Sequence, residues 1–187
     1  MTAAEFEAAG LYDPAAPNAA ERLALLEWFL EQGLSLEQMV HGFRRNAPTG
    51  LAADLALRPG ERLRLEDLAA EVGMPAERIE RIFLAVGLPP ADPEARAFTA
   101  DDATFLRAYQ LGAATFGERF VLPLIRVVGS ALARIAEAAI SLYLVNVERP
   151  LMEAAASELA LARANLDAMR SLSAMLPLLD MFLRAHL

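Results

Sequence analysis

Residues 118–147 read ERFVLPLIRVVGSALARIAEAAISLYLVNV, and this stretch predicts one long helix. Its polar side chains recur at helical spacing and form a single narrow stripe: Arg126, Ser130, Arg134, Glu137 and Ser141. Nearly all of the remaining circumference is apolar. Because a helix that is apolar most of the way round is normally buried, we expect it to be central in the structure. Pro123 is acceptable near its start, and Arg149-Pro150 should end it.

Helix signals also recur before this stretch. Asn18 followed by Glu21 fits a helix start, and Gly33 fits the end of that helix. Ser35 with Gln38 predicts the start of a shorter helix. We therefore expect two consecutive helices in the first quarter of the chain.

The middle of the chain predicts a helix-turn-helix. Turns are expected at 46–50 and 58–60, with a short helix between them. Residues 63–88 then predict two helices, the first ending at Gly73 and the second starting at Pro75.

Further helices complete the chain. After a loop at 88–97, Thr99 with Asp102 begins a helix that we expect to end at Gly112. Two more are expected at 152–173 and roughly 174–187, divided near Pro177.

The predicted fold is all-α because no segment shows the period-two alternation of a strand. We expect one domain overall, in which residues 1–117 form an N-terminal helical region that includes the helix-turn-helix unit. Residues 118–187 would supply the long apolar helices.

Composition excludes several kinds of chemistry. The chain has no cysteine, no lysine and only two histidines, His41 and His186. Disulfides, thiolate zinc sites, cysteine nucleophiles and Schiff-base or phosphate-loop lysines are therefore excluded. The acidic pairs Asp101-Asp102 and Glu66-Asp67 lie near helix starts, where carboxylates stabilise the helix terminus. We expect no catalytic residue, no metal and no tightly bound cofactor.

The charge distribution argues against a nucleic-acid partner. The net charge is −8; residues 1–120 carry 19 acidic and 11 basic groups, whereas residues 121–187 carry 6 of each. Proteins that bind nucleic acid normally present a basic face. With 56% hydrophobic residues, the near-neutral C-terminal third should be buried in a homodimer interface or should line a lipid pocket.

A membrane-spanning helix is not expected from the sequence. The longest uncharged stretches are 82–91, 108–117 and 138–147, whereas a spanning helix needs about 18 apolar residues. The N-terminus (MTAAEFEAAG) is acidic and does not resemble a secretory signal. We expect a cytoplasmic protein without a transmembrane segment.

Four segments together resemble a known family. They are RLALLEWFLEQ at 22–32, LAAEVGMPAERIERIFLAVGL at 68–88, VLPLIRVVGSALARIAEA at 121–138 and MLPLLDMFLRAH at 175–186. Taken in order, they are similar to the regulatory domain that precedes the catalytic domain in actinobacterial class III adenylate cyclases. The resemblance spans nearly the whole chain, although no single motif is diagnostic.

This resemblance implies a function. Such a domain is all-helical and non-catalytic, dimerises through long exchanged helices, binds a fatty acid or similar lipid, and modulates an attached C-terminal cyclase domain in response to pH. It implies that the linker to that catalytic domain would begin where this chain stops. Any bound fatty acid would be a ligand and not a catalytic cofactor.

Candidate site residues follow from the residue chemistry and the resemblance together. Guanidinium groups pair strongly with carboxylates in apolar surroundings, a tyrosine hydroxyl can donate, and methionines adapt to irregular ligands. The lipid-binding candidates are Arg126, Arg134, Tyr143, Met169 and Met175. The pH-sensing candidate is His186, because histidine changes charge near neutral pH. The candidates for coupling to a cyclase are Pro177, Met181 and Leu183 in the C-terminal helix.

Two other interpretations stay open from the sequence. The helix-turn-helix at 63–88 also resembles the DNA-binding unit of MerR-type regulators, although its second helix alternates acidic and basic residues (Glu77, Arg78, Glu80 and Arg81). A free-standing lipid-binding protein is the third interpretation.

Overall fold

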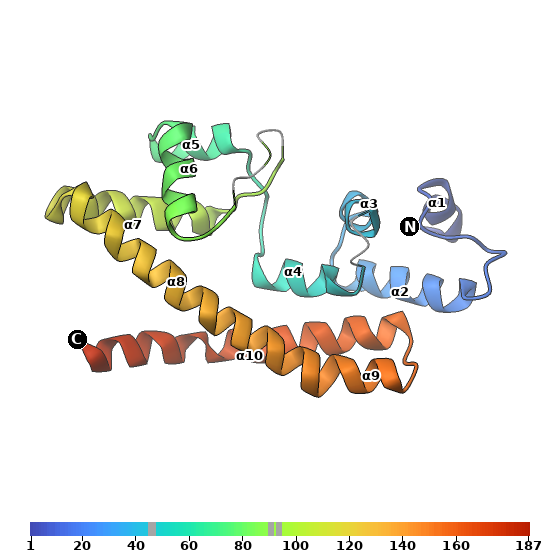
Figure 1. Ribbon diagram of the computed structural model, residues 1–187. Coiled ribbons are helices and arrows are strands. Elements are labelled where there is room, and N and C mark those ends of the chain that lie inside the picture. Colours follow the sequence, from blue (N-terminus) through green and yellow to red (C-terminus); the bar gives the residue numbers. More distant parts are fainter. Residues whose placement is uncertain (45–47, 90–91, 93–94) are drawn as a thin grey trace. The chain divides into compact units, whose positions relative to one another are not determined.

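The computed structural model of the protein describes residues 1–44, 48–89, 92 and 95–187 (Figure 1). In these residues the chain forms helices and no strand, as the periodicity predicted. The helices are α1 (Ala3–Ala8), α2 (Ala19–Glu31), α3 (Leu36–Arg44), η1 (Pro48–Gly50), α4 (Leu51–Leu57), α5 (Leu65–Val72), α6 (Ala76–Ala85), α7 (Ala100–Phe116), α8 (Glu118–Tyr143), η2 (Leu144–Glu148), α9 (Arg149–Glu153) and α10 (Glu158–His186).

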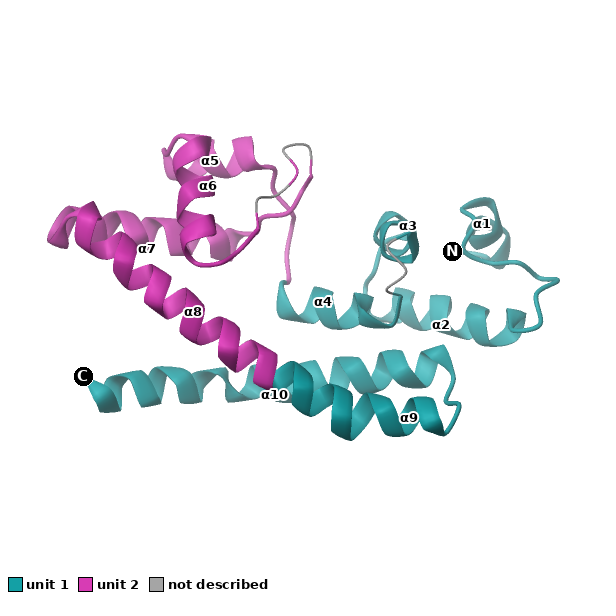
Figure 2. Ribbon diagram, in the orientation of Figure 1, with its two compact units in different colours: residues 1–58, 139–187 teal, residues 59–138 magenta. Residues whose placement is uncertain are grey.

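The chain divides into two compact units (Figure 2). Unit 1 contains residues 1–58 and 139–187, and unit 2 contains residues 59–138. The division expected from composition lay at 117/118 instead. The units follow packing, and the first part of α8 packs with the helices that precede it in sequence.

Unit 1 is held together by α10, which packs against α2, α4 and η1. The N-terminal part of α10 contributes Ala162 and Leu166 to a core shared with Leu26 and Phe29 of α2 and Met39 of α3, all of them buried. Segments from the two ends of the sequence therefore share one hydrophobic core.

Unit 2 contains the helix-turn-helix predicted at 63–88. Its core is formed by Leu68 of α5, Ile79 and Ile82 of α6 and Leu106 of α7, none of which is more than 1% exposed. An isolated antiparallel bridge between Leu63 and Phe98 joins the beginning of the unit to the segment before α7.

Several predicted helix boundaries are confirmed. The Ser35 backbone donates to Gln38 Oε1 at 2.8 Å and the Gln38 backbone donates to Ser35 Oγ at 3.2 Å, which closes a reciprocal cap. The Thr99 backbone likewise donates to Asp102 Oδ2 at 2.7 Å. Gly73 ends α5 with φ +65°, a conformation that glycine adopts readily. The predicted turns at 46–50 and 88–97 lie partly outside the described residues.

The prediction that Gly112 ends a helix is wrong. Helix α7 continues to Phe116, and Gly117 ends it with φ +89°. A single glycine inside a helix costs only about 0.5–1 kcal/mol relative to alanine, so it does not by itself end one. An added Cβ at Gly112 would make ordinary contacts with the Val121 methyl groups, at 3.7 Å, so the packing here does not require a glycine.

The prediction that Arg149-Pro150 ends the long helix is also wrong. Helix α8 passes through the π-helical turn η2 into α9. A proline ring normally clashes with the carbonyl four residues earlier, here that of Asn146. Asn146 lies in the wider π turn, which lets the helix accept Pro150. The helix finally ends at Glu153, before Ala155 with φ +50°.

The predicted division of the C-terminal region at Pro177 is wrong as well. Helix α10 runs unbroken from Glu158 to His186 with Pro177 inside it. Its start is capped by Ser157, whose Oγ accepts the Ala160 N–H at 3.2 Å.

The expectation that the long apolar helix is buried fails for the single chain. In α8 only Val121 and Gly129 are buried. Gly129 packs so closely that a Cβ would meet the backbone of Val86. Leu122 and Ile125 are partly buried against the core of unit 2, whereas most of the other large apolar side chains of the helix are exposed.

Candidate interaction surface

The most prominent feature of the chain is the exposed apolar surface of α8 and η2. Large side chains that are 44–66% exposed follow it from end to end: Phe120, Leu124, Val127, Val128, Leu132, Ile135, Ile140, Leu142, Leu144 and Val145. The helix buries one narrow face near its start and exposes the others.

A second exposed apolar surface covers the C-terminal half of α10. Its members are 41–60% exposed: Met175, Leu176, Leu178, Met181, Phe182 and Leu183. Both buried residues of α10, Ala162 and Leu166, lie in its N-terminal half. We refer to the exposed apolar residues of α8, η2 and the second half of α10 as the apolar helix surface.

An exposed apolar surface of this size is stabilised when a protein or a lipid covers it. Burial of apolar area stabilises by roughly 25 cal/mol per Å², and large exposed apolar patches mark protein–protein or lipid contact sites. The near-neutral charge of residues 121–187 adds little electrostatic repulsion against such contact.

The continuous helix formed by α8, η2 and α9 is long enough to cross a membrane. The stretch Glu118–Glu153 has 36 residues and a sufficiently apolar window, by length and composition alone. The stretch can be apolar enough although charged residues interrupt it, because an 18-residue window within it holds no more than two of them. The absence of a transmembrane segment therefore stays a prediction.

The five lipid-binding candidates are spread over two helices. Arg126 and Arg134 are exposed on α8, and neither forms an ion pair with a described residue. Tyr143 is half-buried at the end of α8; its pKa is raised by burial and by the nearby carboxylate of Glu148. Met169 is half-buried on α10 and Met175 is exposed.

The candidates for pH sensing and coupling lie in the second half of α10. His186 is the last residue of the helix and is exposed, as is Pro177. Met181 and Leu183 are 51% and 60% exposed and belong to the apolar helix surface. All four lie in unit 1, beyond the part of α10 that contributes to the core.

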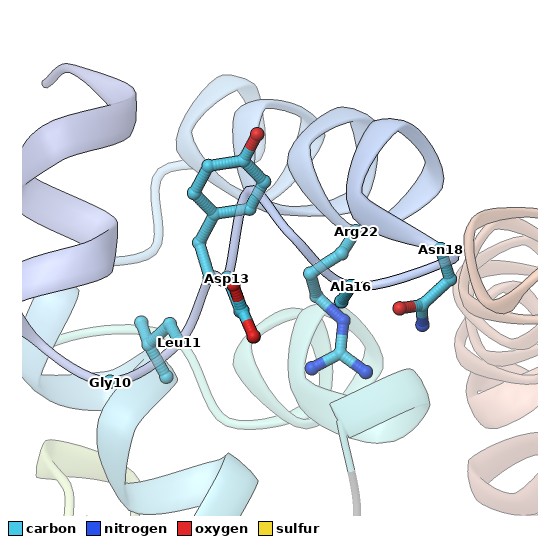
Figure 3. Close-up of a pocket in the computed structure, with 7 residues that line it drawn as sticks. Gly10, Leu11, Asp13, Ala16, Asn18 and Arg22 are labelled. Carbon is cyan, nitrogen blue, oxygen red and sulfur yellow. The ribbon is translucent and has the colours of Figure 1, made fainter.

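Unit 1 has two polar pockets, and none of these candidates lines either of them. One, of about 360 Å³, lies between the loop from Gly10 to Asn18 and the start of α2 (Figure 3). Its only cationic side chain, Arg22, is already paired with Glu158 at 3.0 Å and stacked on Phe43. The other, of about 200 Å³, lies between α2 and α10 and is lined by Trp28, Gln32, Arg163, Leu166, Asp167 and Arg170.

The helix-turn-helix presents mixed charge. Glu77 and Arg81 are exposed on α6, Glu80 is half-buried, and Arg78 is paired with Glu118 at 3.0 Å. A carboxylate at each turn would meet DNA phosphates unfavourably. This arrangement favours a structural role for the unit.

Long-range ion pairs were not visible in the sequence. Arg22 with Glu158, Arg78 with Glu118 and Arg107 with Glu71 each join different helices. No spacing rule connects residues so far apart, because these pairs depend on which helices pack together. Only pairs within one helix, such as Asp180 with Arg184, follow from spacing.

The fold and the surface together describe a helical module that exposes the apolar faces of two of its helices. Its exposed apolar helices offer contact area, and its acidic pairs serve helix starts, as the bond from Thr99 to Asp102 illustrates. Such features characterise a regulatory or assembly domain.

Comparison with known proteins assigns the family. A family model described as adenylate cyclase regulatory domain matches residues 5–187. Uncharacterized protein Rv2212 of Mycobacterium tuberculosis (strain ATCC 25618 / H37Rv) and Uncharacterized protein Mb2235 of Mycobacterium bovis are each 33% identical to the chain over 182 residues. These matches cover 97% of this chain and 47% of each relative, so the chain spans about half the length of the curated relatives it matches. The chain belongs to the adenylate cyclase regulatory domain family.

Proposed function

We propose that this chain regulates cAMP synthesis by an adenylate cyclase domain joined to it, and that it does so as a cytoplasmic homodimer. The observation that carries this proposal is the apolar helix surface. One chain leaves the surface uncovered, whereas a second copy would supply matching apolar helices.

The C-terminal half of α10 is the proposed output element. Pro177, Met181 and Leu183 lie in a stretch that contributes nothing to the core of unit 1. A helix with little packing of its own can adopt a second arrangement for a few kcal/mol, which is the scale of two-state switches.

The regulatory role is tested with a polypeptide in which this chain precedes a class III cyclase domain. Its cyclase activity is compared with that of the catalytic domain alone and of a fusion to an unrelated helical dimer. We expect a change in activity that only this chain produces. Equal activity in the three proteins would contradict the proposal.

We propose a fatty acid or similar lipid as a ligand of the apolar helix surface. Arg126 and Arg134 support this proposal. Each carries a guanidinium that forms no ion pair with a described residue, and both lie on a helix that is apolar most of the way round. Such a group would attract a lipid carboxylate. Tyr143, Met169 and Met175 would contact the ligand.

Lipid extraction and native mass spectrometry of the purified chain test this proposal. We expect a co-purified fatty acid, and less of it in the double variant Arg126→Gln, Arg134→Gln. The matched control is Arg81→Gln, an exposed arginine of α6. Extracts without lipid, or equal amounts in all three proteins, would contradict it.

We propose that pH acts on the same output helix, with His186 as a minor contributor. A positive charge at a helix C-terminus is favoured by roughly 0.3–1 kcal/mol, too little to drive a switch alone. In the fused protein, His186→Ala should shift the pH–activity profile slightly or not at all.

The alternative is a transcription regulator of MerR type, which the acidic residues on α6 disfavour. Gel-shift assays at low salt, where phosphate contacts are strongest, should show no tight binding of DNA. Salt-sensitive binding would favour the alternative.

A further inference from the structure

A glycine corner joins α7 to α8 in unit 2. Gly117 ends α7 with φ +89° and ψ 136°, and α8 starts at the next residue, Glu118. This is a backbone conformation that residues with a side chain rarely adopt. The chain therefore turns from α7 into α8 at a single glycine, and contacts between helices help to set the direction in which α8 leaves it.

The carboxylate of Glu118 provides such contacts with two helices. Arg78 of α6 donates from Nη2 to Oε2 at 3.0 Å and from Nε to Oε1 at 3.3 Å, and Tyr109 of α7 donates its hydroxyl to Oε1 at 3.2 Å. Two parallel bonds from one guanidinium fix the orientation as well as the distance of a carboxylate. We call Arg78, Tyr109 and Glu118 the corner cluster.

A second attachment lies about 16 Å further along α8, at 1.5 Å of rise per residue. There Gly129 packs directly on the backbone of Val86, which follows α6. Two attachments to the same bundle define the direction of a helix. Val121 is also buried in the core of unit 2, and Leu122 and Ile125 pack against that core. With the corner cluster lost, these apolar contacts and Gly129 would remain, but they lack the directional bonds that fix the first turn of α8 after Gly117.

We propose that the corner cluster is a latch that holds α8 in one setting on unit 2. Opening it would change the direction in which α8 carries the chain toward residues 139–187. Of the two places where the chain passes between the units, 58/59 follows the end of α4, whereas 138/139 lies inside continuous helix. The proposal concerns contacts within residues 59–138, so it succeeds or fails independently of the proposed function.

The test measures one distance inside unit 2. The chain has no cysteine, so spin labels can be attached uniquely through Glu66→Cys on α5 and Ala138→Cys on α8, both exposed positions. Dilution with unlabelled chain removes distances between copies. The distance distribution is compared in the background of Arg78→Gln, Glu118→Gln and a matched control, Glu71→Gln.

The control breaks a comparable ion pair that is not at the corner. Arg107 of α7 pairs with Glu71 of α5 at 2.8 Å in the same unit; these side chains are 51% and 40% exposed, against 32% for Arg78 and 47% for Glu118. We expect Arg78→Gln and Glu118→Gln to shift and widen the distribution beyond that of the control. The charge swap Arg78→Glu with Glu118→Arg should return it toward the unmodified chain.

The absorbance titration of Tyr109 checks independently that the cluster exists and has been broken. Burial raises the pKa of this hydroxyl above its ordinary value of 10.0, and the bond to Glu118 and its charge raise it further. Glu118→Gln should therefore lower the pKa of Tyr109, with Tyr109→Phe identifying its signal.

Two outcomes overturn the proposal. In one, Glu118→Gln leaves the pKa of Tyr109 unchanged, so the cluster does not form. In the other, that pKa falls while both variants keep the distance distribution of the control. If Glu118→Gln fails to fold, Arg78→Gln and the charge swap decide, because Arg78→Gln retains the acidic residue at the start of α8.

Discussion

At the scale of single residues, two helical glycines have opposite surroundings. Gly129→Ala would drive a Cβ into the backbone of Val86, which has no flexible end to move aside. We expect a loss of about 1–3 kcal/mol in the free energy of unfolding, the usual cost of overpacking. Gly112→Ala is the matched control, because its Cβ would make ordinary contacts at 3.7 Å; a gain of about 0.5–1 kcal/mol is expected there. Urea unfolding monitored by circular dichroism measures both.

The raised pKa of Tyr109 makes the free energy of unfolding depend on pH in the alkaline range. Its pKa is raised in the folded chain, chiefly by burial, relative to 10.0 when unfolded. A raised pKa gives stability that is complete below the unfolded value and is lost as the pH rises through the folded value. The chain has neither lysine nor cysteine, so tyrosines are the only side chains that titrate between about pH 9 and 11.

The free energy of unfolding should therefore fall above about pH 10. The slope should be smaller in Tyr109→Phe, with a remainder from Tyr143, whose pKa is also raised. Identical slopes in the two proteins would show that Tyr109 is not buried against Glu118 in solution.

What the sequence could predict at this scale was local. The caps of Ser35 with Gln38 and Thr99 with Asp102 follow from residues three apart, and both are present. Contacts such as Arg78 with Glu118 depend on the packing of three helices, and no local pattern encodes them. The roles of the candidate site residues likewise depend on partners that a single chain does not supply.

At the scale of helices, the sequence predicted which segments are helical better than it predicted the residues at which the helices end. Apolar periodicity placed a helix at 118–147 and a helix-turn-helix at 63–88, and both are present. The errors were at Gly112, Pro150 and Pro177, where a local helix breaker was expected to end the helix. Propensity is a weak term beside packing and continuity: a π turn accommodates Pro150, and α7 keeps Gly112 in its interior.

Pro177 weakens a helix that little else supports. Proline in a helix interior is about 3 kcal/mol less favourable than alanine, and the second half of α10 contributes no buried residue. Pro177→Ala should therefore increase hydrogen-exchange protection of residues 178–186. Pro150→Ala should have a smaller effect, because the π turn already accommodates that ring. In a protein with an attached cyclase domain, Pro177→Ala should also change basal activity; unchanged protection and activity would mean that the switch lies in another helix.

At the scale of the whole molecule, the sequence predicted that the apolar residues of the C-terminal third exceed what one chain needs for its core, but not which leucines that core takes up. Leu25 and Leu26 lie at the core of unit 1, whereas Leu124 and Leu132 are 60% and 46% exposed. Composition cannot distinguish these two groups, because both are leucines in helices. The difference arises only when neighbouring helices cover one group and leave the other open.

From the exposed apolar residues of α8 we predict that the chain forms a dimer. Sedimentation velocity at micromolar concentration should show the mass of two chains, since burial of the apolar helix surface removes a large apolar area from water. The double variant Leu124→Glu, Val128→Glu should sediment as a monomer with unchanged helix content, because both side chains are already exposed in the single chain. Leu84→Glu on α6, a leucine that is 53% exposed outside this surface, should remain dimeric. A soluble wild-type monomer would contradict the interface, and binding of that monomer to phospholipid vesicles would assign the surface to lipid instead.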